Sequence, residues 1–381
     1  MRIALVHSFY SSLQPSGENQ VVLAQVDALQ DAGHEVLLVA RYTDRASQER
    51  GYSVRAALGV ATGFGPDPTK DLRTFSPNVV HVHNLFPNFG TRWLSRWEGP
   101  LVATLHNFRP LCANGLLYRD GHNCTQCPDG DRFASVRHGC YHDSRIATLP
   151  LAIRNARGLI HDAVIQRANR IVVLAERARA VYEGYGISSG ELSLVPNFVT
   201  SVNGGVRSAP AHERWISVGR LSGEKGFGEL LQMWPAGIPL DIAGEGSLRA
   251  QLEAIAPPGV RLLGMKPAAE LRLSLPVYTG LVFPSRWMEG AIPLVVLEAL
   301  EAGIPVVARE GNGGADQIRS TGCGRVYSDQ GPNGLAAALT AVRDGGDSLR
   351  ERARATWQDQ FSAKAWVAAT VRTYEEAGAR A

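Results

Sequence analysis

Two runs of alternating strand-like and helix-like segments are the feature that most limits how this chain can fold. The first run opens with an apolar segment at residues 2–7, a helical pattern over residues 21–32 and a second apolar segment at residues 34–39. It continues with apolar segments at residues 79–83, 101–106, 170–174 and 192–195. Short, nearly continuous apolar segments are typical of strands buried on both faces of a parallel sheet. The first run therefore predicts a doubly wound α/β domain.

The second run follows a polar, turn-rich segment at residues 200–213, which we interpret as a linker. Its predicted helices cover residues 227–233 and 294–301. Its predicted strands are residues 215–218, 240–243, 260–263, 280–283 and 305–308. We expect two Rossmann-like domains that face a cleft, with ligands beyond the carboxyl ends of the strands. The predicted divisions are residues 1–198, residues 199–365, and residues 366–381 as a C-terminal helix that packs back on the first domain.

The charge and hydropathy of the chain limit which partners it can bind and where in the cell we expect it. The 381 residues carry a formal net charge of +3, so the charge indicates no nucleic-acid partner. The apolar segment at the N-terminus is too short for a signal peptide, and no apolar stretch reaches the ~18 residues of a membrane span. We therefore expect a cytoplasmic protein.

A basic helical pattern over residues 145–170 leaves room for peripheral contact with a membrane. The arginines of this region are Arg145, Arg154, Arg157, Arg167 and Arg170, and leucine and isoleucine residues lie between them. In one interpretation such a helix lies on anionic lipid or grips an anionic acceptor. In the other, it packs on the core and its basic face is merely solvated.

Two basic side chains lie in the loop after the predicted strand 215–218. The loop contains Gly219, Arg220 and Lys225, and a predicted helix begins at Phe227. Fixed cations beside a helix N-terminus suit a bound diphosphate. The alternative is a solvated loop with ordinary surface charges.

Two glutamates follow the predicted strand 280–283. Glu289 lies in a tight loop, and Glu298 lies in the predicted helix 294–301. Carboxylates accept hydrogen bonds from sugar hydroxyls, and loop amides can meet phosphate or sugar oxygens. The alternative is a surface glutamate and a helix-face glutamate without a ligand.

Taken together, these segments resemble the retaining glycosyltransferases of family 4, which have the GT-B fold. The similar segments are residues 218–227, 244–246 and 284–308, in the same order and with similar spacing. The resemblance covers nearly the whole chain and is looser in the N-terminal half. It implies transfer of a hexose-like sugar from a nucleoside diphosphate, bound by the second domain, to an acceptor bound by the first. The acceptor (polysaccharide, lipid-linked or natural product), the base and the sugar are not identified by the sequence.

The resemblance assigns roles in the second domain residue by residue. Arg220 and Lys225 match the basic pair that holds the donor diphosphate, Glu298 matches the glutamate that bonds the ribose, and Glu289 matches the acidic residue that bonds the transferred sugar. The other predicted donor-binding residues are Gly219, Gly246, Lys266, Gly290, Ala291, Ile292, Pro293 and Leu294.

One departure from the family concerns the spacing of the glutamates. The family separates them by seven residues, and eight residues lie between Glu289 and Glu298 here. Either the loop bulges by one residue or Glu289 does not hold the sugar-binding place. We expect the bulge, because loops absorb insertions easily.

The N-terminal half offers fewer candidates. Gly17 lies in the segment 15–19, which resembles the family's loop near the donor phosphates, although the family often has two glycines there. His106 resembles the histidine that contacts the transferred sugar. Without the resemblance, a packed and hydrogen-bonded histidine is the simpler interpretation, and His81 and His83 are weaker candidates still.

The resemblance also implies how the reaction proceeds. No residue of the N-terminal half is an obvious carboxylate nucleophile of the glycosidase type. The family transfers the sugar on its front face, and the departing diphosphate receives the acceptor's proton. We therefore expect Arg220, Lys225, Glu289 and His106 to act by positioning and charge stabilisation, with no cofactor or metal required for catalysis.

Four of the five cysteines lie in a cysteine-rich loop over residues 107–142, which is predicted to be irregular. They are Cys112, Cys124, Cys127 and Cys140. A C-x-x-C pair with two further thiols suits a structural zinc site, which would stabilise a loop without a core of its own. The alternatives are four reduced thiols or a disulfide, and an odd count without an export signal argues against a disulfide framework.

Each rival function would require a different sequence feature or a different activity. A nicotinamide dehydrogenase needs a glycine-rich turn after the first strand, and residues 8–12 contain no glycine. A sugar-nucleotide epimerase shares the two-domain architecture and would act without an acceptor. A non-catalytic binding protein would bind the nucleotide sugar without turnover.

Overall fold

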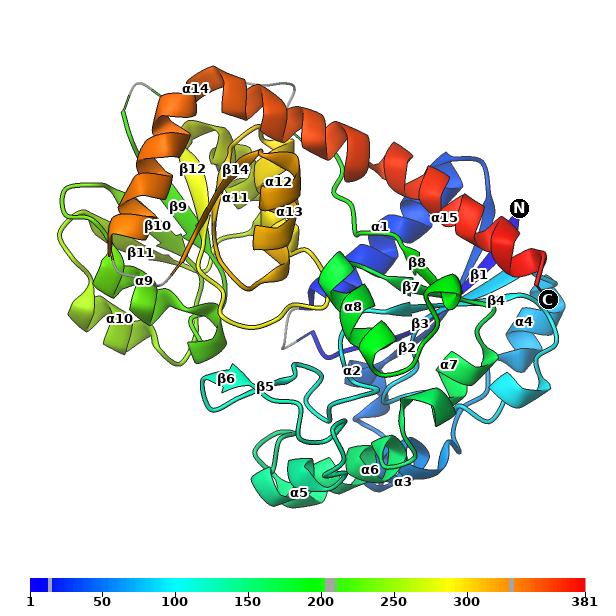
Figure 1. Cartoon of the computed structure of the whole chain (residues 1–381). Helices are drawn as coiled ribbons and strands as arrows, with labels where there is room; N and C mark the ends of the chain where they lie inside the picture. The colour runs from blue at the N-terminus through cyan, green and yellow to red at the C-terminus, as the bar shows by residue number, and fades with distance from the viewer. Residues whose placement is uncertain (13–15, 203–209, 211, 329–331, 381) are drawn as a thin grey trace. The chain divides into compact units, whose positions relative to one another are not determined.

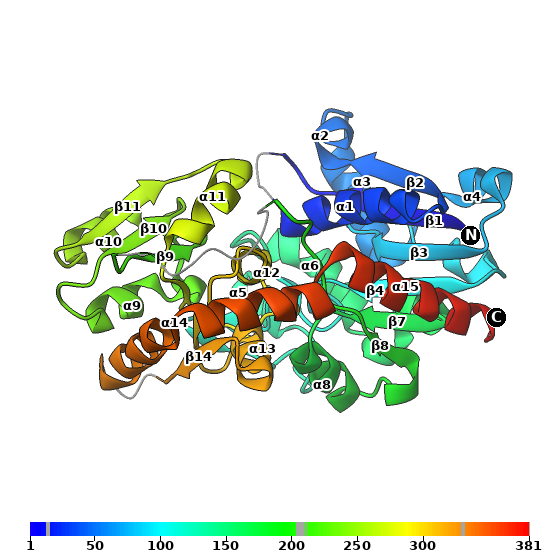
Figure 2. The same ribbon diagram turned by 90° about the horizontal axis from the view of Figure 1, so that it is seen from above.

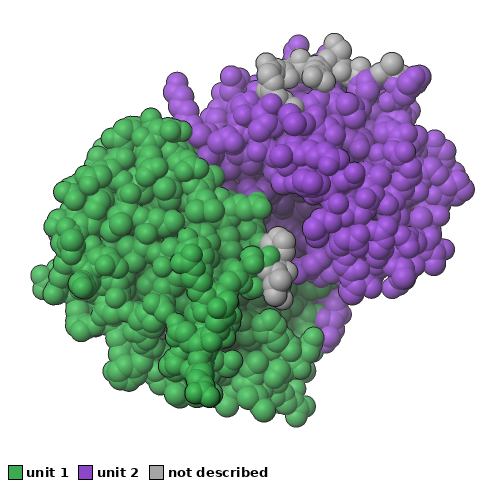
Figure 3. Space-filling model, turned by 180° about the vertical axis from the view of Figure 1, so that it is seen from behind, with its two compact units in different colours: residues 1–119, 124–196, 366–381 green, residues 120–123, 197–365 purple. Residues whose placement is uncertain are grey.

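The computed structural model describes the whole chain except residues 13–15, 203–209, 211, 329–331 and 381. The described chain divides into two compact units (Figure 3). The first unit comprises residues 1–119, 124–196 and 366–381, and the second comprises residues 120–123 and 197–365. Each unit has a six-stranded sheet of its own.

The sheet of the first unit is parallel, with strand order β2-β1-β3-β4-β7-β8 (Figure 1). Its strands are β1 (Arg2–Phe9), β2 (Glu35–Tyr42), β3 (Val79–Asn84), β4 (Leu101–Leu105), β7 (Arg170–Val173) and β8 (Leu192–Leu194). Strands β1, β3 and β4 are buried along almost their whole length, as their continuous apolar sequences predict. The direction in which new strands are added reverses between β1 and β3.

The helices of the first unit connect these strands. They are α1 (Gly17–Asp31), α2 (Thr43–Ala46), α3 (Tyr52–Thr62), α4 (Thr69–Phe75), α5 (Ala134–His138), α6 (Arg145–Asn155), α7 (Ala163–Arg167), α8 (Glu176–Gly184) and most of α15 (Ala363–Gly378). Its 3₁₀ turns are η1 (Leu94–Arg96), η2 (Leu159–His161) and η3 (Ser189–Glu191). Among the described residues, no helix combines the length and the apolar character that a membrane crossing requires.

The sheet of the second unit is also parallel, with strand order β11-β10-β9-β12-β13-β14. Its strands are β9 (Trp215–Val218), β10 (Leu240–Ala243), β11 (Val260–Gly264), β12 (Gly280–Phe283), β13 (Val306–Arg309) and β14 (Gly324–Tyr327). The order reverses between β9 and β12, which makes this pair the switch point of the sheet. Right-handed crossovers on the two sides of such a point send the connecting helices to opposite faces.

The helices of the second unit are mostly short. They are α9 (Phe227–Met233), α10 (Arg249–Ile255), α11 (Ala268–Ser274), α12 (Leu294–Glu301), α13 (Gly313–Thr321) and α14 (Pro332–Gln360), with 3₁₀ turns η4 (Gly223–Lys225) and η5 (Leu275–Val277). The long helix α14 is interrupted at Gly346, whose backbone is not helical. Trp215, Phe227 and Trp234 anchor the apolar core beneath the sheet.

Helix α15 lies against the first sheet (Figure 2). The Tyr374 hydroxyl is 2.8 Å from Nδ1 of His81 in β3, and Glu376 pairs with Arg170 in β7. The other ring nitrogen of His81 is 2.7 Å from the Thr104 hydroxyl in β4. His81 is therefore a packed, hydrogen-bonded residue that joins two strands to α15.

The prediction of one helix over residues 145–169 is wrong. The structure forms α6, η2 and α7 there, with a break at Gly158, whose φ of 90° and ψ of 157° no helix accommodates. Ser144 caps the start of α6, and Asp162 caps the start of α7, so each helix has its own beginning. The predicted linker falls mainly on residues 203–209 and 211, which lie outside the described residues.

Candidate functional site

The loops after β9 and β12 pack together at the switch point of the second sheet. Gly226 has a φ of +71°, and a Cβ on it would lie 2.2 Å from the carbonyl oxygen of Pro284, so only glycine permits this approach. The Arg286 amide donates to the Glu224 carbonyl over 2.9 Å and ties the loops together. Open parallel sheets bind ligands at such a point.

Lys225 and Glu289 form an ion pair between these two loops. Lys225 Nζ donates to Glu289 Oε1 over 2.8 Å, although 64 positions separate the residues. The Ser285 hydroxyl donates to the same oxygen over 3.2 Å. The side chains are 21% and 5% exposed, so the pair is largely removed from water. The structure thus brings together two residues that the sequence singles out separately.

Glu289 keeps an unused acceptor. Burial raises the pKa of Glu289, and the neighbouring Lys225 opposes that rise. Its second carboxylate oxygen, Oε2, is buried and has no hydrogen-bond partner in the described part of the chain. A buried oxygen of this kind is costly unless a ligand or water donates to it. Lys225 Nζ also lies 5.3 Å from the centre of the Trp287 ring. The pair therefore offers an acceptor for a hydroxyl beside a cation for an anion.

Arg220 is placed differently from Lys225. Its side chain is 70% exposed and lies 3.3 Å from Glu224 Oε1, four residues along the chain. Glu224 also accepts from the Ser222 hydroxyl over 2.6 Å. An exposed pair with this spacing contributes little to stability, so the guanidinium can turn toward an anion at small cost.

Glu298 projects from α12 toward Arg272 of α11. Arg272 Nε is 3.8 Å from Glu298 Oε1, and the Glu298 side chain remains 17% exposed. Burial raises the pKa of Glu298, Arg272 opposes the rise and Glu301 adds to it. Arg272 is not among the predicted site residues, because nothing in the sequence of α11 pairs it with α12.

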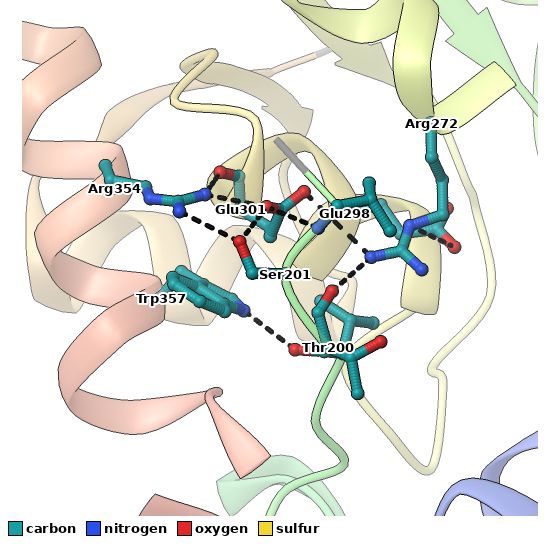
Figure 4. A network of polar contacts seen from close by, with 9 residues as sticks. Thr200, Ser201, Arg272, Glu298, Glu301, Arg354 and Trp357 are labelled. Atoms are coloured by element: carbon teal, nitrogen blue, oxygen red, sulfur yellow. Dashed lines mark hydrogen bonds and ion pairs between the residues drawn. The ribbon is translucent and has the colours of Figure 1, made fainter. Parts of the chain in front are cut away.

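Glu301, one turn further along α12, has a structural role (Figure 4). Its carboxylate accepts from the Ser201 hydroxyl over 2.9 Å, from the Val202 amide over 3.1 Å and from Arg354 of α14 over 2.7 Å. Trp357 of α14 donates to the Val199 carbonyl over 3.0 Å. This network, centred on the fully buried Glu301, fastens the start of the second unit to α12 and α14. Of the two glutamates on α12, Glu298 is the one with a partly open carboxylate.

The glycines and the loop before α12 position the site. A Cβ on Gly246 would lie 2.4 Å from the Leu221 carbonyl oxygen, whereas a Cβ on Gly219 would meet only the Phe227 ring, at 3.5 Å. Gly246 is therefore required for packing, whatever it contacts in a ligand. Residues 290–293 lead into α12, whose first residue is Leu294, as predicted. The predicted members Gly290, Ala291, Ile292, Pro293 and Leu294 thus form the segment that runs from Glu289 into α12.

Lys266, the predicted neighbour of the base, lies just beyond β11. Its ammonium pairs with Glu270 over 3.2 Å, and the side chain is 37% exposed. No described contact joins it to Lys225 or Glu289. Its role stays a prediction.

In the first unit, His83 of β3 and His106 after β4 are directly paired. His83 Nδ1 is 3.0 Å from His106 Nε2. Burial lowers the pKa of both rings well below the usual value, and neighbouring histidines add to the effect. Both rings are therefore neutral near pH 7, so one N–H donates to a bare nitrogen of the other. A neutral ring can bond a sugar hydroxyl without adding charge.

A cavity of about 130 Å³ lies beside this pair, and its walls include His83, His106, Glu18 and Arg109. Burial raises the pKa of Glu18 to about 7, and Arg109 opposes that rise. Asn107 Nδ2 donates to Glu18 Oε2 over 3.4 Å. Glu18 and Arg109 are absent from the predicted set. Glu18 nevertheless lies in the segment 15–19, which the sequence marks for its glycine.

Gly17 is the first residue of α1 and is exposed. The residues just before it, 13–15, lie outside the described part of the chain, so the structure gives no geometry for the predicted phosphate loop.

The cysteine-rich loop contains short elements and a shared thiol cavity. In addition to α5, the loop contains a two-stranded sheet of β5 (Tyr118–Arg119) and β6 (His122–Asn123). A cavity of about 20 Å³ is lined by all four cysteines: Cys112, Cys124, Cys127 and Cys140. Burial raises the pKa of the Cys140 thiol to about 11, and the other three thiols add to the rise. Among the described residues, no group of three or more cysteine, histidine or acidic side chains has the geometry of a metal site. The structure thus shows neighbouring thiols without a finished ligand set.

Two family descriptions match this chain in succession. Glycosyltransferase Family 4 matches residues 15–201, and Glycosyl transferases group 1 matches residues 212–344. With the paired parallel sheets, these matches define a glycosyltransferase of the GT-B fold. The chain belongs to glycosyltransferase family 4, which confirms the resemblance drawn from its sequence motifs.

One curated relative and several solved structures are similar to this chain. The amylovoran biosynthesis glycosyltransferase AmsK of Erwinia amylovora is 31% identical over 148 residues, which are 35% of this chain and 36% of that protein. The chain thus matches about a third of the length of this relative. Sucrose-phosphate synthase from Thermosynechococcus elongatus has a similar fold over 100% of both chains, with a TM-score of 0.69 and 16% identity. Anabaena HepE in complex with UDP and glucose matches 98% of this chain and 99% of its own, with a TM-score of 0.62 and 14% identity.

Proposed function

We propose that this protein is a retaining glycosyltransferase that moves a hexose-like sugar from a nucleoside diphosphate to an acceptor hydroxyl. The observation that carries the proposal is the Lys225–Glu289 pair, which holds a cation and an open carboxylate oxygen at the switch point of the second sheet. The structure of HepE with UDP and glucose supports a nucleotide-sugar donor for a protein of this fold.

The donor's parts fit different residues of the second unit. Lys225 and the exposed Arg220 neutralise the diphosphate, and the amides of the segment 290–292 and of Leu294 donate to the same oxygens. Glu289 Oε2 accepts from a hydroxyl of the transferred sugar. Glu298 accepts from the ribose hydroxyls, and Arg272 holds its carboxylate in place.

The reaction then needs no carboxylate nucleophile. As the glycosidic C–O bond to the diphosphate breaks, Lys225 and Arg220 stabilise the negative charge that develops on the leaving oxygen. The acceptor oxygen attacks the same face of the sugar, and its proton passes to the departing diphosphate. His106, kept neutral and oriented by His83, bonds a hydroxyl of the transferred sugar.

The test is binding followed by transfer. Thermal-shift measurements with UDP, GDP, ADP and TDP, and with their common sugar conjugates, identify the donor by its stabilisation of the folded state. NMR of the product's anomeric proton then reads the configuration. An inverted product would refute the retaining mechanism, and turnover of the sugar nucleotide to an epimer without an acceptor would refute the transferase assignment.

We also propose that the four-cysteine cavity holds a structural zinc ion. The support is that four thiols of this loop line one small cavity. Zinc would have to draw them together as thiolates, which offsets the pKa rise that burial imposes. Elemental analysis should find about one zinc per chain. The Cys124→Ser, Cys127→Ser variant should lose it, and Cys323→Ala, a buried thiol elsewhere, should keep it. Zinc-free protein with a folded first unit would overturn this proposal.

A further inference from the structure

The residues that line the cavity beside His106 carry buried polar atoms that the first unit leaves unsatisfied. Glu18 Oε1, His83 Nε2 and Arg109 Nε are buried, and none of them has a hydrogen-bond partner among the described residues. An unpaired buried polar atom is costly, so each one in a native structure needs an explanation, such as a bound ligand. Three such atoms on residues that share one cavity of about 130 Å³ indicate a polar ligand there.

Asn107 links two of these residues, Glu18 and Arg109. Its Nδ2 donates to Glu18 Oε2 over 3.4 Å, and its Oδ1 accepts from the Arg109 backbone amide over 3.0 Å. The Arg109 guanidinium is held as well, because it donates to the Ala113 carbonyl over 3.1 Å and lies 4.5 Å from the centre of the Phe86 ring. Both side chains are therefore held in place, and each keeps one polar atom for a ligand.

The charges of the cavity wall favour a neutral ligand over an ion. Burial raises the pKa of Glu18 and Arg109 opposes that rise, so the two groups offset each other. Arg154 and Asp162, which also line the cavity, pair over 2.6 Å. The remaining basic residues of the wall are exposed to water, which screens their charge: Arg157 and His161. A buried ion would lack a partner of opposite sign, whereas a hydroxyl group is neutral and both donates and accepts.

We propose that this cavity binds a neutral sugar unit of the acceptor, and that Glu18 and Arg109 select it by bonding two of its hydroxyls. Glu18 Oε1 accepts from one hydroxyl, Arg109 Nε donates to another, and Asn107 is the positioning residue for both. The inference rests on the proposed sugar transfer and specifies the acceptor as a glycoside with free hydroxyls. The donor's sugar already has Glu289 of the second unit, whereas every residue of this cavity belongs to the first unit.

The test compares Glu18→Gln with the unmodified chain in binding and in transfer. Saturation-transfer NMR with the methyl glycosides of glucose, galactose, mannose and rhamnose, without and with UDP, should find a neutral sugar that the unmodified chain binds. Glu18→Gln should weaken the binding of that glycoside about tenfold or more, because a charge-assisted hydrogen bond is lost. Arg109→Lys keeps the charge but lacks the Nε donor, so it should weaken binding as well. In transfer assays, Glu18→Gln should raise the KM for the glycoside and leave kcat little changed.

The control is Glu98→Gln, which replaces an exposed glutamate of the same unit and should bind the glycoside like the unmodified chain. Circular dichroism and thermal melting check that each variant is folded. Failure to bind any of the four glycosides, or equal binding by folded Glu18→Gln, would overturn the inference.

Isothermal titration separates the acceptor's sugar from the donor's. Glu18→Gln should bind the sugar nucleotide and the nucleoside diphosphate like the unmodified chain. If it weakened binding of the sugar nucleotide alone, the cavity would hold the transferred sugar and the inference would be wrong. Glycoside binding that depends on Glu18, without transfer from any sugar nucleotide, would support the sugar site and refute the proposed function instead.

Discussion

The two units place their candidate residues at equivalent points of similar sheets, yet the chemistry there is opposite. Both sheets are parallel and six-stranded, and in each the order reverses near the first strand. The second unit sets an ion pair at its switch point, Lys225 with Glu289. The first unit sets neutral rings near its own, His83 with His106. Architecture selects the position of each site, and side chains decide what it can hold.

The difference suits a reaction in which charge changes on one side only. A leaving diphosphate gains negative charge, so fixed cations are useful beside it. An acceptor hydroxyl and a sugar ring remain neutral until the proton moves, so uncharged donors and acceptors are sufficient there. If the contrast is functional, substitutions in the two units should have different signatures.

The largest effect is expected for Lys225→Ala. It removes the cation from the diphosphate and also leaves the buried carboxylate of Glu289 without its positively charged partner. Loss of one charge-assisted contact is worth about 1.5–3 kcal/mol, so affinity for the nucleoside diphosphate should fall about tenfold to 150-fold. Isothermal titration measures this, and thermal melting should show lower stability as well. The matched variant Arg220→Ala should weaken binding but leave stability unchanged, because Arg220 is exposed. Equal affinity in both variants and the unmodified chain would remove the diphosphate assignment.

The next effect separates the two glutamates of the second unit. Glu289→Gln should damage transfer and leave binding of the free nucleoside diphosphate nearly intact, because its open oxygen addresses the sugar. Glu298→Gln should weaken the binding of both nucleotide and sugar nucleotide, because the ribose is common to them. Titration with each ligand, alongside turnover assays, distinguishes the two patterns. Full turnover by Glu289→Gln would show that the loop does not bulge and that other groups hold the sugar.

A smaller effect should separate packing from ligand contact among the glycines. Gly246→Ala forces a Cβ to within 2.4 Å of the Leu221 carbonyl oxygen, so the backbone must shift. We expect a loss of about 1–3 kcal/mol in unfolding free energy, measured by denaturant titration. Gly219→Ala meets only the edge of Phe227 and should leave stability nearly unchanged. If Gly246→Ala were as stable as the unmodified chain, the backbone at Gly246 would be able to move away from the Leu221 carbonyl oxygen without cost.

The smallest effect concerns the neutral histidines. Burial lowers the pKa of His83 and His106, whereas the unfolded value is about 6.5. Protonation then favours the unfolded chain, so their contribution is present above about pH 6.5 and is lost as the pH falls below it. The melting temperature should therefore drop less between about pH 7.5 and 5.5 in His106→Asn than in the unmodified chain. The exposed His122, replaced by asparagine, is the control for loss of a histidine outside this pair. An unchanged slope in His106→Asn would show that His106 is charged or solvated at neutral pH.

Some elements of this site could be predicted from the sequence because they depend on local sequence patterns. The strand at residues 215–218, the helix from Leu294 and the continuous apolar segments agree with the structure closely. These features depend on neighbours a few positions away, such as glycines in loops and apolar periodicity. The family motifs in the second half worked for the same reason, since each is a short segment.

Other features depended on contacts that no local pattern carries. Arg272 meets Glu298 only because α11 and α12 pack together, and buried Glu301 turns out to be structural although it lies on the same helix as Glu298. The prediction of a single helix over residues 145–169 is wrong at Gly158, whose backbone has a positive φ. The arginine spacing gave no sign of this break.

By itself, the sequence determined the α/β class and the family, and it singled out Lys225 and Glu289 as candidates, because apolar alternation and motif spacing are properties of consecutive residues. Only the tertiary structure decided that Lys225 and Glu289 meet across 64 positions and that His83 orients His106. The physical reason is that pairing and burial depend on which distant segments the fold brings into contact. Burial then sets the protonation state of a side chain and decides which of its polar atoms remain without a hydrogen-bond partner.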